Sequence, residues 1–176
     1  YLLIYQLDAF VFKDDLRLWC DKGYDYVGAP WLARAWPQNF MTHVRKRLRV
    51  HRIENFWYWN LIPKRRFTRR RDNVVGNGGF SLRNVSSSLA ALDDLRAYAD
   101  EWQWNEDTFW GIFAPNMLRR FRVPPASIAA RFSLELEPRD GYRMNGAQLP
   151  FGCHAWWSID PDFWRPHFKS HGLDIQ

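Results

Sequence analysis

The sequence has 176 residues, a length that suits one domain over 1–176 under the usual range of roughly 100–200 residues per domain. Its 47% apolar and 25% charged residues are normal for a globular protein, and no apolar run approaches the ~18 residues that a membrane span requires. The net charge is +6, and the two cysteines lie outside any Cys-x-x-Cys pattern, so they indicate neither a disulfide framework nor a zinc site.

The N-terminal part of the chain predicts two strands with a helix between them. Residues 2–5 form a short apolar run that is typical of a buried strand. Asp14 can cap a helix that stops at Gly23 and has a face made of Leu16, Trp19 and Cys20. The second strand is expected over 24–27.

Basic residues gather in the region that follows. A helix predicted from Phe40, Val44 and Leu48 carries one cluster, and a loop carries another. The two clusters are Arg45, Lys46, Arg47, Arg49 and Arg52, and Lys64, Arg65, Arg66, Arg69, Arg70 and Arg71. Such runs suit phosphates, nucleic acid or an anionic membrane surface, and a solvated helix face followed by a basic loop explains them equally well. Residues 55–62 are aromatic-rich and predict no definite element.

The second half again alternates strands with helices. Strands at 74–75 and 80–82 flank a glycine turn. Asn84 or Ser86 caps the helix that follows, and its apolar stripe is Val85, Leu89, Leu92 and Leu95.

The remaining segments continue this alternation. A helix is expected over 106–113, a helical turn over 126–131, a strand over 132–136 and a turn-rich aromatic tail from residue 150 onward. Alternating strands and helices predict the α/β class.

The glycine turn is the most informative segment of the chain. Three of the ten glycines, Gly76, Gly78 and Gly79, lie within four residues, and Asn77 stands among them. Glycine is used where the backbone passes through positive φ, or where a ligand approaches the main chain closely. The clustering therefore predicts a site, although an ordinary tight turn also accounts for it.

Four acidic or metal-capable side chains stand near the ends of predicted elements. Asp8 follows the first strand, Glu106 and Asp107 begin a helix between tryptophans, and His154 lies among aromatic residues. Each has an ordinary explanation as a turn cap, a helix-dipole partner or a satisfied core histidine. Large aromatic side chains beside paired carboxylates can, however, desolvate them and raise a pKa.

The order of these motifs resembles that of GT-A-fold glycosyltransferases. More narrowly, it resembles a mostly bacterial family that is catalogued as a domain of unknown function and whose members are expected to be glycosyltransferases. More distantly, it resembles the β-1,4-galactosyltransferases. The similarity runs from Tyr5 to Trp164, and residues 6–12, 24–31 and the glycine turn are its most specific parts. It implies a GT-A-like domain with a mixed sheet flanked by helices. This chain is expected to be a C-terminal portion of that domain, without the N-terminal nucleotide-binding strands.

The resemblance implies a metal site and a base. Asp8 matches the final acid of the Asp-x-Asp motif that holds a divalent metal on the donor diphosphate, with Gln6 in place of the first acid. His154 is the expected second ligand, and its imidazole favours Mn²⁺ over Mg²⁺. Asp107, or else Glu106, would be the general base that activates an acceptor hydroxyl.

The resemblance also implies the binding residues and partners. The expected substrate-binding residues are Trp31, Gly76, Asn77, Gly78, Gly79, Phe80, Arg83 and Trp104. The donor would be a nucleotide sugar, by expectation a UDP-sugar, and the acceptor a glycan or a lipid-linked or phosphorylated glycoconjugate. Transfer with inversion is expected by analogy with the galactosyltransferases. We expect a cytoplasmic protein, with peripheral contact to the inner membrane as an option.

Two other functions remain open at this stage. A nucleic-acid-binding module would use the two basic clusters with their interleaved aromatic residues, but it leaves the glycine turn and His154 without a role. A carbohydrate-binding or truncated domain without catalysis would keep the fold and lose the activity.

Overall fold

The structure is a computed structural model that describes residues 1–32 and 75–174. The predicted helix around Phe40 to Leu48, the aromatic segment 55–62 and both basic clusters lie outside the described residues. Within the described part, no helix combines the length and the apolarity that crossing a bilayer requires.

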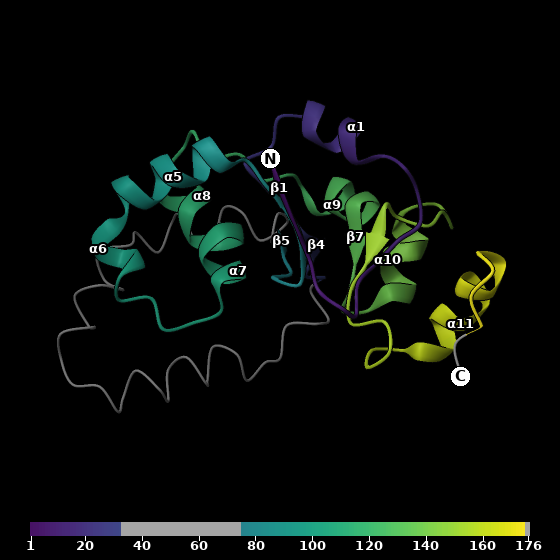
Figure 1. Cartoon of the computed structure of the whole chain (residues 1–176). Coiled ribbons are helices and arrows are strands. Elements are labelled where there is room, and N and C mark those ends of the chain that lie inside the picture. Colours follow the sequence, from purple (N-terminus) through teal and green to yellow (C-terminus); the bar gives the residue numbers. More distant parts are fainter. Residues whose placement is uncertain (33–74, 175–176) are drawn as a thin grey trace.

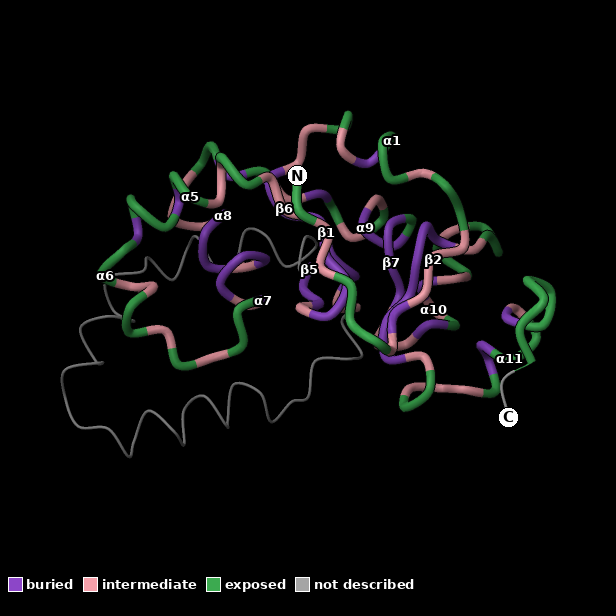
Figure 2. The backbone as a smooth tube through the Cα atoms, in the orientation of Figure 1, coloured by how far each residue is buried: buried purple, intermediate pink, exposed green. Residues whose placement is uncertain are grey.

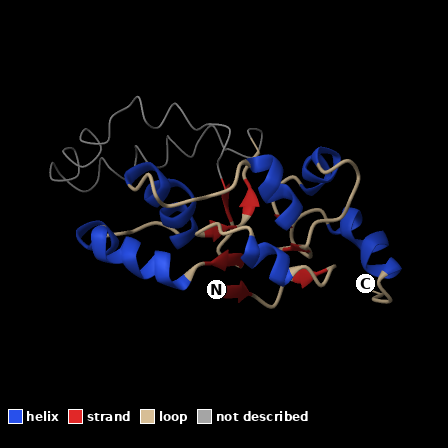
Figure 3. Cartoon of the chain, turned by 90° about the horizontal axis from the view of Figure 1, so that it is seen from above, coloured by secondary structure: helices blue, strands red, loops and turns tan. Residues whose placement is uncertain are grey.

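The strands of the described residues form three small sheets, which lie centrally in Figures 1 and 3. The first sheet is antiparallel with the order β1-β6-β3, made of β1 (Leu2–Tyr5), β6 (Phe80–Arg83) and β3 (Tyr26–Val27). The second is a two-stranded antiparallel pair of β4 (Ala29–Pro30) and β5 (Val75–Gly76). The third is mixed: β8 (Gly152–Cys153) pairs antiparallel with β2 (Phe10–Val11) and parallel with β7 (Ser133–Leu134).

The helices stand on two sides of these strands, α5 to α8 on one side and α9 to α11 on the other, while α1 lies at one end (Figure 1). The first group consists of α5 (Val85–Asp94), α6 (Arg96–Ala99), α7 (Glu106–Thr108), the π-helical turn η2 (Phe109–Phe113) and α8 (Ala114–Met117). The remaining helices are α1 (Leu16–Asp21), α9 (Ala126–Phe132), α10 (Pro138–Met144) and α11 (Pro161–Ser170).

This architecture confirms the predicted α/β class, although the sheets are small and mostly antiparallel. The strands on both sides of the glycine turn are confirmed, and the helix predicted from residue 106 does begin at Glu106. Asn84, rather than Ser86, caps α5, because its side-chain oxygen accepts a hydrogen bond from the Ser87 amide at 3.2 Å.

Two apolar segments of the sequence are more exposed than their composition suggests, and for the first of them the expectation of burial is wrong. β1 is not a buried strand, since it lies at the edge of its described sheet and leaves Leu2 and Tyr5 each 50% exposed. The apolar stripe of α5 is also largely exposed, because the helix turns Ala91 toward the core, and the buried Leu95 follows its last residue. Its exposed members are Val85, Leu89 and Leu92.

Several boundaries also differ from expectation. α1 begins after Asp15 rather than Asp14, and no side chain caps it. The strand predicted over 132–136 shrinks to β7, because α9 continues through Phe132. α10 and α11 were not expected from the sequence, although Pro138 and Pro161 at their first positions are a common helix-start signal. The preceding residues Glu137 and Asp160 have left-handed φ values, and their side chains form no capping hydrogen bond.

Side chains that point alternately to the two faces of β3 and β6 belong to different hydrophobic clusters of the core. Figure 2 shows the buried segments in the interior, surrounded by exposed ones. Val27, Phe80 and Leu82 pack into one cluster with Phe132. Tyr26 faces the opposite way, into a cluster that includes Val75, Phe109, Trp110 and Phe113. Because successive strand residues point to opposite faces, β6 also places Ser81 and Arg83 on the Tyr26 side.

The helical run from α7 through α8 lies unusually close to β5 at Gly111. A Cβ atom at Gly111 would lie 1.7 Å from the Val75 carbonyl oxygen, a backbone atom that cannot swing aside. The bare Gly111 therefore sets how closely the helix that begins with Glu106 and Asp107 approaches the glycine turn.

We predict that Gly111→Ala destabilises the protein despite the better helix propensity of alanine. That propensity contributes only about 1 kcal/mol, whereas overpacking against backbone costs about 3 kcal/mol or more, so a net loss of about 2 kcal/mol is expected. Urea unfolding measures the difference. The control is Gly146→Ala, which meets no atom within 4 Å but has a φ of +65°, and which should cost about 1 kcal/mol. A Gly111→Ala variant as stable as wild type would contradict this packing.

Candidate functional site

The turn between β5 and β6 owes its shape to Asn77 rather than to its glycines. Asn77 has a φ of +83°, while the positive-φ glycines of the described residues, Gly23, Gly146 and Gly172, all lie elsewhere. The Asn77 side-chain oxygen accepts hydrogen bonds from the amides of Gly79 at 3.1 Å and Phe80 at 3.0 Å. Asparagine tolerates this conformation because its side chain bonds to nearby backbone. The expectation that glycine supplies the positive φ is therefore wrong here.

The glycines instead make room for other side chains. A Cβ atom at Gly76 would lie 1.9 Å from the Trp31 ring. At Gly78 it would lie 2.4 Å from Glu106 Oε1, and at Gly79 it would lie 1.9 Å from His154 Nε2. Three of the side chains predicted for the site thus lie directly against the turn.

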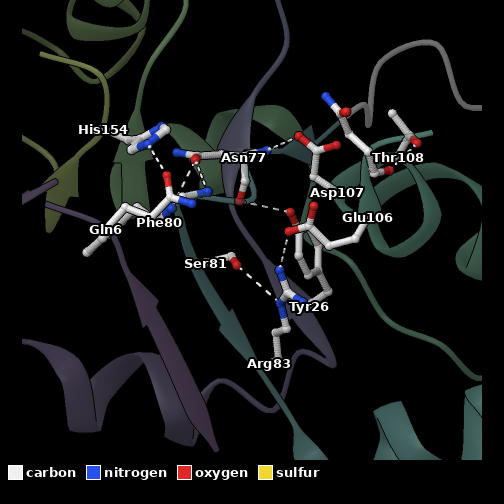
Figure 4. Close-up of polar contacts among 12 residues, drawn as sticks. Gln6, Tyr26, Asn77, Phe80, Ser81, Arg83, Glu106, Asp107, Thr108 and His154 are labelled. Carbon is white, nitrogen blue, oxygen red and sulfur yellow. Dashed lines mark hydrogen bonds and ion pairs between the residues drawn. The ribbon is translucent and has the colours of Figure 1, made fainter. Parts of the chain in front are cut away.

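Asp107 lies on one side of the turn, as Figure 4 shows. Its Oδ2 accepts a hydrogen bond from the Asn77 amide at 3.2 Å, while Oδ1 is buried without a partner among the described residues. Burial raises the pKa of this carboxyl above its ordinary value, and the nearby charge of Glu106 raises it further. The Asn77 carbonyl in turn accepts from the Tyr26 hydroxyl at 3.2 Å, so one residue connects Asp107 to the core.

Glu106 has a different environment from its neighbour. Its carboxylate accepts a hydrogen bond from Arg83 Nη2 at 2.9 Å, and its side chain is 53% exposed. The Arg83 side chain is only 14% exposed, and its guanidinium lies over the rings of Tyr26 and Trp110 and also donates to Ser81 Oγ at 3.3 Å. The two adjacent carboxylates therefore differ in burial and in their partners.

His154 lies on the other side of the turn, together with Gln6 (Figure 4). Its Nδ1 is 2.8 Å from Glu135 Oε1, while its Nε2 is 3.2 Å from Asp8 Oδ1 and 3.1 Å from Gln6 Oε1. Burial lowers the pKa of His154, but the hydrogen bond to Glu135 and the charges of Glu135 and Asp8 outweigh it. The net effect is a pKa above the ordinary value for imidazole.

Strand register explains why these residues converge. Cys153 pairs with Leu134 in the parallel ladder and with Phe10 in the antiparallel one. The His154 amide continues the ladder by donating to the Leu134 carbonyl at 3.1 Å. His154, the residue after Leu134 and the residues before Phe10 therefore meet at one end of the mixed sheet.

The predicted metal ligands fit a divalent ion only in part. Asp8 and His154 are in contact as expected, and Gln6 adds an amide oxygen beside them. Within the described residues, no group of three or more His, Cys, Asp or Glu side chains is arranged to hold a metal. This chain therefore supplies one carboxylate oxygen, one imidazole nitrogen and one amide oxygen, and phosphate oxygens or water would have to complete the coordination.

The remaining predicted residues fall into two groups. Trp31, Asn77, Phe80 and Arg83 belong to the turn or lie directly beside it. The ring of Trp104 instead packs edge-on against Trp102 at 5.0 Å, in the segment that precedes α7.

The sequence analysis missed Glu135 and Tyr26 as parts of this site. Glu135 had a weak signal, because it lies within a predicted strand as a charged residue among apolar ones. Only the strand register reveals its partner. Tyr26 gave no signal, because a buried aromatic residue in a strand looks like any core residue.

The chain belongs to the family described as "Protein of unknown function (DUF5672)", whose profile matches residues 1–154. The match covers β1 through β8 and ends at His154. Neither the curated proteins nor the solved structures contain a significant match.

The environment of Asp107 leads to a stability prediction. Asp107→Ala leaves the buried Asn77 amide without its acceptor and should cost about 1–3 kcal/mol, whereas Asp107→Asn keeps an oxygen acceptor there. Because the folded pKa of Asp107 is raised, wild type loses stability as the pH rises from the unfolded pKa through the folded one. The stability of Asp107→Asn relative to wild type should therefore increase as the pH rises through that window. Urea unfolding from acid to neutral pH checks this, and a gain in the opposite direction would contradict the raised pKa.

Proposed function

We propose that this protein is a metal-dependent glycosyltransferase with a GT-A-like fold, which transfers a sugar from a nucleotide-sugar donor to a glycan or glycoconjugate hydroxyl. One observation carries the proposal. The turn at 76–79 has Asp107 hydrogen-bonded to one side and His154, with Asp8 and Gln6, packed against the other. The candidate base, Asp107, and the candidate donor-binding group around His154 are thus separated only by the backbone of this turn.

Asp107 is better suited to the role of base than Glu106. A carboxylate with a raised pKa accepts a proton more readily, and the pKa of Asp107 is raised. The Glu106 oxygen is already engaged by Arg83. In this proposal Glu106 and Arg83 form an ion pair beside Gly78. The negative charge of Glu106 also makes Asp107 more basic.

Asp8, His154 and Gln6 would hold the divalent ion on the donor diphosphate. Mn²⁺ is the expected ion, because an imidazole ligand favours it over Mg²⁺. When bound, such an ion neutralises the negative charge that builds on the leaving diphosphate. The residues that this chain supplies leave coordination positions for phosphate oxygens, which is the arrangement that a donor-bound metal requires.

The proposed reaction is a direct displacement at the anomeric carbon. The acceptor hydroxyl oxygen forms a bond to that carbon while its proton passes to the Asp107 carboxylate. The bond between the anomeric carbon and the diphosphate oxygen breaks, and the nucleoside diphosphate leaves with both bonding electrons. Attack from the side opposite the leaving group inverts the configuration of the sugar.

We predict that Asp107→Asn in the full-length protein lowers turnover of a UDP-sugar by at least about 100-fold and leaves donor binding nearly unchanged, because a base acts on the acceptor. In wild type, kcat/KM should fall on the acid side as the pH drops through the raised pKa of Asp107. The control is Asp100→Asn at an exposed helix end, which should keep full turnover. Normal turnover by Asp107→Asn would refute the base assignment.

We further predict that Mn²⁺ affinity rises with pH, because the raised pKa of His154 keeps a proton on the imidazole that the metal must displace. Asp8→Asn and His154→Ala should each weaken Mn²⁺ binding and donor affinity, and a chelator should stop turnover. Electron paramagnetic resonance of free Mn²⁺ across pH measures the affinity. Asp14→Asn and His171→Ala, both exposed, are the matched controls. Mn²⁺ affinity that falls with pH, or that survives both site substitutions, would contradict the metal assignment.

A further inference from the structure

We propose that Glu135 is a positioning residue, which holds the proton of His154 on Nδ1 and thereby turns Nε2 toward Asp8 and Gln6. The proposal concerns the imidazole itself, and its consequence for metal binding rests on the function proposed above. Glu135 was not among the residues predicted from the sequence, and no step of the proposed transfer uses it.

The contacts of the imidazole carry the proposal. The 2.8 Å separation of Nδ1 from Glu135 Oε1 is a short hydrogen bond, and a carboxylate can only accept. On the opposite edge, Nε2 lies near two oxygen atoms, Asp8 Oδ1 and Gln6 Oε1. A neutral imidazole carries one proton, for which the carboxylates of Glu135 and Asp8 compete. Glu135 Oε1 lies 2.8 Å from Nδ1, whereas Asp8 Oδ1 lies 3.2 Å from Nε2, and the closer carboxylate favours the proton on Nδ1.

The backbone holds Glu135 in this position. Leu134, which precedes it, pairs with Cys153, which precedes His154, and the His154 amide donates to the Leu134 carbonyl. Glu135 and His154 therefore each follow the last paired residue of two neighbouring parallel strands, which brings their side chains together. The Glu135 side chain is 16% exposed and that of His154 is 11% exposed, so water competes little for their hydrogen bond.

This arrangement has a chemical consequence for Nε2. With the proton held on Nδ1, the Nε2 lone pair points to the same place as the oxygen atoms of Asp8 and Gln6. Histidine ligands of metals generally donate their other N–H to a carboxylate or carbonyl, and loss of that acceptor typically weakens metal binding by about 10–100-fold.

Nitrogen-15 NMR of the imidazole rings tests the proposal without any metal. Spectra recorded at a pH where all five histidines are neutral report the tautomer of each ring, and His154→Gln identifies the His154 signals. We expect the Nδ1–H tautomer in wild type and in Glu135→Gln, whose amide oxygen still accepts. We expect a shift toward the Nε2–H tautomer in Glu135→Ala. The matched control is Glu101→Ala at an exposed position, which should leave the His154 signals unchanged.

An Nε2–H tautomer in wild type, or a His154 spectrum that Glu135→Ala leaves unchanged, would overturn the proposal. If Glu135→Ala fails to fold, the wild-type and Glu135→Gln spectra still decide, because an Nε2–H tautomer in both overturns it. Mn²⁺ titration of the same samples then separates the two proposals. Weaker binding to Glu135→Ala by about 10–100-fold, with Glu135→Gln closer to wild type, supports both. If no Mn²⁺ binds to wild type, the proposed function fails, while the tautomer result still decides the role of Glu135.

Discussion

The close approach of side chains to the turn at 76–79 is the constraint on which the rest of the site depends. Gly78 and Gly79 lack the Cβ atoms that would overlap Glu106 and His154, and Asn77 provides the left-handed backbone between β5 and β6. A side chain at Gly79 would push His154 away from the sheet end where it meets Asp8 and Glu135. The absence of side chains at Gly78 and Gly79 thus allows Glu106 and His154, which are far apart in the sequence, to lie against the same turn.

Electrostatics follow from this packing. Asp107 is buried next to another carboxylate, so its pKa is raised, and Asn77 offers its amide as the main compensation. His154 lies between two carboxylates, so its pKa is also raised, although burial acts in the opposite direction. Both groups therefore hold a proton more readily than free side chains do. A carboxylate of this kind suits the acceptance of a proton, while the imidazole must release its own before it can bind a metal.

Much of this site could be predicted from the sequence, because its signals are local. The strands that flank the glycine turn, the Asn84 cap and the helix start at Glu106 all depend on near neighbours in the chain, and the structure confirms them. The contact of Asp8 with His154 was expected from the order of motifs and is also confirmed. Features that depend on residues far apart in the chain were harder to predict. The role of Glu135 depends on the register between β7 and β8, and the exposure of β1 depends on its place at a sheet edge.

The glycine turn shows that one sequence pattern can have several structural causes. Clustered glycines suggested positive φ or an approaching ligand, yet the positive φ belongs to Asn77 and the glycines face side chains of the same chain. Composition alone does not distinguish these causes, because each requires the absence of a Cβ atom. Only the packing of Trp31, Glu106 and His154 around the turn separates them.

The most direct test of the account is where Mn²⁺ binds when a nucleoside diphosphate is present. Paramagnetic broadening of backbone amides in the ¹⁵N-labelled protein locates the ion. We predict that the amides of Gly79, His154 and Asp8 broaden first, and that those of Asn77 and Asp107 broaden after them. Broadening centred on the exposed carboxylates of α5, or no broadening near the turn at all, would contradict the claim that this turn is the centre of a metal-dependent transfer site.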